Sequence, residues 1–76
     1  MEWRDHIEMK IDVLCGKAVI KGSRLSVDHI VGLLAQGWLE ADVLDAYPGL
    51  TRDDILACLK YAAEAVAHEQ LFPVGV

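Results

Sequence analysis

The chain has 76 residues, a formal net charge of −5 and a hydrophobic fraction of 54%. This length leaves room for one domain with a small core, and the acidic charge opposes binding to the phosphate backbone of nucleic acids unless the few cations cluster. No apolar run approaches the ~20 residues of a transmembrane helix, no targeting signal opens the chain, and the two cysteines lie far apart. We therefore expect a reduced, cytoplasmic protein without a disulfide, whose surplus apolar surface favours a subunit interface.

The first predicted element is a half-buried β-strand over residues 7–13, because its apolar and charged side chains alternate strictly. The apolar positions are Ile7, Met9, Ile11 and Val13. A second β-prone run covers 18–20, with turns on both sides. We therefore expect a β segment over 6–27 that forms a short hairpin. So small a sheet must lie on the helices or pair with a second copy of itself.

Three helices are predicted over 27–69, in helix-turn-helix order. Ser26 is the expected N-cap of the first helix and Gly37 its left-handed C-cap. The second covers 40–47 and ends before Pro48; it lacks a side-chain cap because Leu39 stands at that position. Thr51 opens the third, with Asp54 three residues later in a capping box.

The third helix carries two apolar rows. Spacings of four, three and four residues predict that the first row, Ile55, Leu59, Ala62 and Val66, faces the core. The second row is Cys58, Tyr61 and Ala65. We also expect Trp38 and Tyr47 to be core aromatics.

Surplus apolar surface on the first strand and the third helix predicts a homodimer. An apolar tail over 70–76 lacks helical spacing and is expected to be flexible until a partner orders it. The residues predicted to form the dimer or partner interface are Ile7, Met9, Ile11, Tyr61, Ala65, Leu71 and Phe72.

Candidate nucleic-acid contacts are few. Lys17, Lys21 and Arg24 form the only local excess of positive charge, with a solvated sheet edge as the alternative interpretation. On the third helix, Arg52 is the one side chain suited to reading bases, and the two aspartates that follow it would repel phosphate.

Catalytic chemistry finds little support in the sequence. The three histidines are scattered without the spacing of a metal site, and Cys58 lies within an apolar helix, where a thiolate is disfavoured. No glycine pattern suits a phosphate-binding loop. We expect no enzymatic activity, no metal and no cofactor.

Three fragments carry a family resemblance: GKAVIKGSR at 16–24, YPGLT at 47–51 and LKYA at 59–62. In order and spacing they resemble the G-K-P-V-I-x-G-T-R, Y-P-x-L-T and A-L-x-Y-A blocks of the family named domain of unknown function 433. Its members resemble VapB-type antitoxins, which implies a small dimer with a homeodomain-like three-helix bundle after a short hairpin.

The function that this resemblance implies is that of an antitoxin in a type II toxin–antitoxin pair. Such a protein would bind and neutralise a PIN-like ribonuclease toxin and regulate its own operon by binding DNA. The alternative is a free-standing dimeric helix-turn-helix transcription regulator that acts on a palindromic operator. A neighbouring toxin-like reading frame would favour the first hypothesis, and a salt-dependent gel shift by the isolated protein would favour the second.

Overall fold

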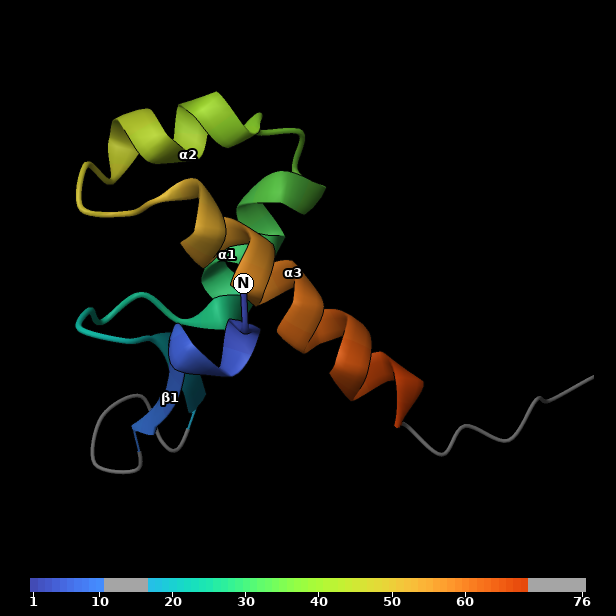
Figure 1. Cartoon of the computed structure of the whole chain (residues 1–76). Helices are drawn as coiled ribbons and strands as arrows, with labels where there is room; N and C mark the ends of the chain where they lie inside the picture. The colour runs from blue at the N-terminus through green and yellow to red at the C-terminus, as the bar shows by residue number, and fades with distance from the viewer. Residues whose placement is uncertain (11–16, 69–76) are drawn as a thin grey trace, which may run out of the picture.

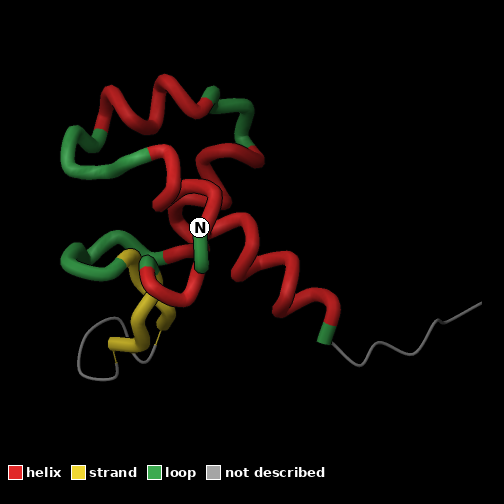
Figure 2. The backbone as a smooth tube through the Cα atoms, in the orientation of Figure 1, coloured by secondary structure: helices red, strands yellow, loops and turns green. Residues whose placement is uncertain are grey.

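The computed structural model describes residues 1–10 and 17–68. A short 3-10 helix and a two-stranded hairpin precede three α-helices (Figures 1 and 2). The elements are η1 (Trp3–Asp5), β1 (Ile7–Lys10), β2 (Lys17–Ile20), α1 (Val27–Ala35), α2 (Glu40–Ala46) and α3 (Arg52–Ala67). The prediction of a mainly helical chain with a small N-terminal hairpin is confirmed. The predicted continuation of the first strand to Val13, the interface residues Ile11, Leu71 and Phe72, and the tail over 70–76 lie outside the described residues.

The hairpin is antiparallel, with Ile7 opposite Ile20 and Met9 opposite Ala18. Ile7 packs against the core, as the alternation predicts. Met9 lies on the same face of β1 as Ile7 but is 57% exposed, because the elements around Met9 leave an open groove rather than a covered core. β2 is buried along three of its four residues, so the hairpin is attached to the helices mainly through this strand.

Local chemistry sets the ends of α1 as predicted. The Ser26 hydroxyl accepts a hydrogen bond from the His29 amide at 3.3 Å. After α1, Gly37 has a φ of 101°. The Gly37 amide donates to the Leu34 carbonyl at 3.0 Å and the Trp38 amide to the Leu33 carbonyl at 3.1 Å. This pair of bonds is a Schellman motif, which needs positive φ at the residue that supplies the first donor, here Gly37.

The other two helices also begin and end where the sequence indicates. Leu39 provides no side-chain cap for α2, but its own amide donates to Asp42 Oδ2 at 2.8 Å. α2 ends at Ala46, directly ahead of the Tyr47–Pro48 step. At α3 the Asp54 amide donates to Thr51 Oγ1 at 3.2 Å and the Thr51 amide to Asp54 Oδ2 at 3.0 Å. The predicted capping box is therefore confirmed.

The core lies where β2, α1 and α3 meet, with α2 contributing Val43. Its largest fully buried side chains are Ile20, Ile30, Ile55, Val19, Val43 and Cys58. Tyr47 packs against this cluster and shares a 2.9 Å hydrogen bond with His29 Nε2 through its hydroxyl. Its prediction as a core aromatic is thus half correct, because the ring is only partly buried.

Two predictions about packing are wrong. In the row expected to face the core, Ile55 is 1% exposed, but Leu59 is 41% and Val66 is 65% exposed. The reason is length: α3 has 16 residues and α1 has 9, so the last turns of α3 project beyond α1 (Figure 1), while η1 contacts another side of this helix through Tyr61. Trp38 is 37% exposed because the Schellman turn places it at the edge of the α1–α2 connection.

Candidate functional site

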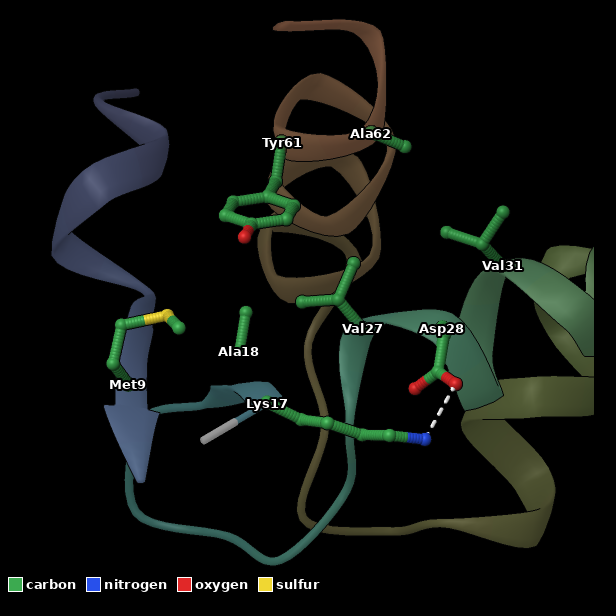
Figure 3. Close-up of a pocket in the computed structure, with 8 residues that line it drawn as sticks. All are labelled: Met9, Lys17, Ala18, Val27, Asp28, Val31, Tyr61 and Ala62. Carbon is green, nitrogen blue, oxygen red and sulfur yellow. Dashed lines mark hydrogen bonds and ion pairs between the residues drawn. The ribbon is translucent and has the colours of Figure 1, made fainter. Parts of the chain in front are cut away.

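An open groove of about 450 Å³ lies where the hairpin meets α1 and α3. We call it the hairpin groove. Figure 3 shows Met9, Tyr61 and Val31 around it, with Ala18 and Val27 between them. Its lining residues are Met9, Lys17, Ala18, Val27, Asp28, Val31, Tyr61 and Ala62. Most of these side chains are apolar, which is typical of a surface that another molecule covers.

Local structure explains why these side chains converge. Ala18 lies opposite Met9 in the hairpin, and its small side chain leaves the space between β1 and the helices open. Val27 is the first residue of α1 after the Ser26 cap, and Val31 follows one turn later on the same side. Tyr61 comes from α3, where its ring meets Trp3 of η1 edge-to-face at 5.6 Å between centroids. The 3-10 helix thus holds Tyr61 beside the groove.

An ion pair forms the polar rim of the hairpin groove. Lys17 Nζ donates to Asp28 Oδ2 at 3.0 Å, the dashed contact in Figure 3. Hydrogen bonds from Ser26 and then from Lys17 hold the pKa of the Asp28 carboxyl below its ordinary value. Both side chains are more than half exposed, so the pair contributes at most about 1 kcal/mol to stability. Its main effect is that Lys17 is neutralised.

The four predicted nucleic-acid contacts are not gathered into one patch. Lys17 is the first residue of β2 and Lys21 follows its last residue, ~13 Å away along an extended strand. Arg24 lies in the turn that follows, and Arg52 Nε pairs with Glu40 Oε1 at 3.0 Å. Of the four, Lys21 and Arg24 alone make no ion pair with the described residues.

The predicted interface residues separate into three groups. Met9 and Tyr61 come together in the hairpin groove. Ile7 packs against the core, and the exposed Ala65 lies next to a shallow hollow that Trp3 also lines. Sequence reasoning missed Val27 and Val31 as groove residues because their helical spacing marks them as core. Trp3 was missed because no periodic pattern includes it.

Among the described residues, the polar side chains do not assemble a recognisable reactive centre. Within residues 1–10 and 17–68, no group of three or more His, Cys, Asp or Glu side chains is placed to hold a metal ion. Burial raises the pKa of the Cys58 thiol to about 12, and the charge of Asp54 adds to this effect. His6 Nδ1 donates to Asp54 Oδ1 at 2.8 Å, which joins the start of the hairpin to the start of α3. In the described part of the chain, no helix is both long and apolar enough to cross a bilayer.

Comparison with known proteins identifies the family. A sequence profile described as "Protein of unknown function (DUF433)" matches residues 7–62. The chain belongs to the DUF433 family. This confirms the family predicted from the three sequence blocks. Every residue that lines the hairpin groove falls within the region that defines DUF433.

The fold is similar to that of a solved DUF433 protein. The crystal structure of a DUF433 member from Anabaena variabilis superposes with a TM-score of 0.79 at 30% sequence identity. The match covers 84% of this chain and 63% of that chain, so this chain spans less than two thirds of the length of that DUF433 protein. No protein with a curated description matches the sequence.

Proposed function

We propose that this DUF433 protein acts by binding other proteins, as the antitoxin of a type II toxin–antitoxin pair that neutralises a PIN-like ribonuclease. The observation that carries the proposal is the hairpin groove together with the exposed apolar side of α3. The resemblance of the family to VapB-type antitoxins supplies the class of partner. In this proposal the three helices form a homeodomain-like helix-turn-helix bundle, and the protein acts as a homodimer in the cytoplasm.

Exposed apolar surface supports a binding role. Met9, Leu59 and Val66 are 57%, 41% and 65% exposed. Each Å² of apolar surface removed from water contributes about 25 cal/mol, so covering such side chains stabilises a complex. A domain of this size has little stability to spare, which makes a partner-covered surface advantageous.

The proposal assigns the surface to two partners. A second copy of the chain lies along β1 and the hairpin groove, because β1 pairs only with β2 among the described strands and therefore stands at the edge of this sheet. The ribonuclease lies along the exposed apolar side of α3. There Leu59 and Val66 are seven residues apart and therefore share one side of the helix.

The second candidate function is a dimeric transcription regulator. The observation in its favour is that Lys21 and Arg24 make no ion pair with described side chains, which leaves their charges available to phosphate. Against it, Lys17 and Arg52 are paired with Asp28 and Glu40, and the net charge is −5. DNA binding, including regulation of the protein's own operon, is therefore the less supported activity.

Three lysine substitutions at exposed apolar positions test the proposal. The chain is co-expressed with the product of the neighbouring reading frame. Association is measured by pull-down and ribonuclease inhibition, and self-association by light scattering at micromolar concentration. We expect Met9→Lys to give a monomer and Val66→Lys to lose the ribonuclease. Leu39→Lys, the matched control at a residue that is 68% exposed on another surface, should keep both.

The possible results separate the hypotheses. No association of the wild-type chain with the neighbouring product would remove the antitoxin role. If Leu39→Lys and Val66→Lys weakened association with the ribonuclease equally, the binding role proposed for α3 would be wrong. A gel shift of the upstream promoter that weakens steeply with salt, without any protein partner, would support the transcription regulator instead.

A further inference from the structure

A second groove, of about 350 Å³, lies between two turns on another side of the molecule. We call it the turn groove. One wall is the turn between β2 and α1 and the other is the loop between α2 and α3; both turns lie on the left in Figure 1 and are green in Figure 2. Leu25, Tyr47 and Leu50 line it with partly buried apolar surface, and Lys21 adds a cation. It shares no lining residue with the hairpin groove.

Hydrogen bonds fix both walls of the turn groove. The Ser23 hydroxyl donates to the Ile20 carbonyl at 2.8 Å and accepts from the Leu25 amide at 3.0 Å. In the opposite wall the Leu50 amide donates to the Tyr47 carbonyl at 2.9 Å. A groove with walls held in this way loses little entropy when it binds a ligand.

Charge at the turn groove differs from charge elsewhere on the described surface. Four of the cations have a carboxylate within 4.0 Å, in the pairs Glu2–Arg4, Lys17–Asp28, Glu40–Arg52 and Lys60–Glu64. Lys21 and Arg24 are both exposed, lie in the same turn, and have no carboxylate that close within the described part of the chain. An otherwise acidic molecule thus presents two uncompensated positive charges in one wall of an apolar groove: Lys21 lines the groove, and Arg24 lies in the same turn without lining it.

We propose that the turn groove binds a peptide segment of a partner protein that carries a carboxylate next to an apolar side chain. The carboxylate lies between Lys21 and Arg24, and the apolar side chain lies on Leu25 and Leu50. Asp54 also lines the groove, but its Oδ1 accepts from His6 and its Oδ2 from the Thr51 amide. Its remaining negative charge directs the ligand's carboxylate toward the Lys21 end.

An acidic peptide fits this surface better than a nucleic acid does. A polyphosphate would place further charges near Asp53 and Asp54, whereas one carboxylate needs only the two available cations. Tyr47 is not a free platform for a base, because its ring already contacts His29 edge-to-face and its hydroxyl is hydrogen-bonded there.

A peptide titration followed by NMR tests this inference. The probe is the acetylated and amidated pentapeptide Gly-Asp-Leu-Glu-Gly, added to the ¹⁵N-labelled full chain while the amides of Gly22, Ser23 and Leu50 are observed. We expect saturable shifts at these amides. We also expect roughly tenfold weaker binding when the two acids of the peptide are replaced by their amides, since partly screened charge contacts contribute on that scale.

Charge reversal at exposed positions provides the protein-side test. Lys21→Glu and Arg24→Glu should each weaken binding about five- to tenfold. Lys60→Glu changes the net charge equally at a position of α3 that does not line the turn groove, and should leave binding unchanged. Amide dispersion in the variants' spectra confirms that each remains folded.

Five results would overturn the proposal. The first is that the acidic peptide causes no saturable shift. The second is that the amide peptide binds as tightly as the acidic one, and the third is that Lys60→Glu weakens binding as much as Lys21→Glu and Arg24→Glu do. The fourth is tighter binding of a single-stranded dodecamer of DNA at the same amides, which would assign the turn groove to nucleic acid. If the same amides shift with protein concentration alone, the occupant is a second copy of the chain and the proposed partner is also wrong.

Discussion

Replacing Asp54 by alanine removes two interactions at the start of α3. Asp54 Oδ2 accepts the Thr51 amide at 3.0 Å, and Asp54 Oδ1 accepts from His6 Nδ1 at 2.8 Å. The reverse bond of the capping box, from the Asp54 amide to Thr51 Oγ1, uses backbone and survives the substitution. The variant therefore isolates what one carboxylate contributes.

The expected loss of stability follows from the surroundings of these two bonds. A side-chain bond at a helix cap contributes about 1 kcal/mol. The side chains of His6 and Asp54 are 26% and 16% exposed, so their bond lies between a screened surface pair and a buried charged one, also about 1 kcal/mol. Together they give about 2 kcal/mol, or a fall in Tm of roughly 10 °C for a domain of this size.

Acid should abolish most of the stability difference between the wild-type chain and Asp54→Ala. Burial raises the pKa of the Asp54 carboxyl, but hydrogen bonds from His6 and Thr51 outweigh it, and the pKa lies below its ordinary value. A carboxyl whose folded pKa is below its unfolded pKa contributes stability that is fully present above the unfolded value. That contribution is lost as the pH falls through the folded value. The gap between wild type and Asp54→Ala should therefore narrow below about pH 4.

Urea unfolding followed by circular dichroism measures both effects. Asp53→Ala is the matched control, because Asp53 is exposed in the same first turn and its loss changes charge and helix propensity equally. The reasoning is refuted if Asp54→Ala and Asp53→Ala differ by less than about 0.5 kcal/mol at neutral pH. It is also refuted if their difference stays constant down to about pH 3.

Three further predictions concern α3, α2 and the buried thiol. In urea unfolding, Ile55→Ala should lower the free energy of unfolding by about 2–5 kcal/mol, whereas Val66→Ala, from the same apolar row but 65% exposed, should lower it by less than about 0.5 kcal/mol. Equal losses would mean that the row is buried throughout. Leu39→Ser should raise the free energy of unfolding by about 1 kcal/mol, because it gives α2 the side-chain acceptor that this helix lacks. An unchanged value would mean that the hydrogen bond from the amide of residue 39 to Asp42 already caps α2 fully. Because the pKa of the Cys58 thiol is raised to about 12, we expect that in a Cys15→Ser background this thiol reacts with an aromatic disulfide reagent at about pH 8 only after urea unfolds the chain. Rapid labelling of the folded protein would contradict the burial of Cys58.

The features that sequence reasoning predicted correctly depend on neighbours a few residues apart. The Ser26 cap, the Gly37 turn and the Thr51–Asp54 box each involve hydrogen bonds over at most five positions, including the bond from Trp38 to Leu33. Residue type at each position therefore determines most of the geometry. The same holds for the stop before Pro48, which excludes helical dihedrals at the preceding residue.

The incorrect predictions depend on distant partners. Helical spacing shows that Leu59 and Val66 share a side of α3, but it does not show that α1 ends too early to cover them. Tertiary arrangement also decides which of the predicted basic residues are paired. Lys17 meets Asp28 across the hairpin and the start of α1, and Arg52 meets Glu40 from another helix. Pairings of this kind depend on the tertiary arrangement, so charge counts along the chain overestimate the free cations.

The uneven support of α3 has a consequence for hydrogen exchange. Its first half contains the buried Ile55 and Cys58, while Val66 in its last turns is held mainly by the helix's own backbone bonds. A short helical segment with little tertiary packing is marginal in water. Amides near Val66 should therefore exchange through local opening, whereas amides near Cys58 should exchange only on global unfolding. A protein that binds the last turns of α3 would slow exchange there first. The protection profile along this single helix would then locate the binding partner.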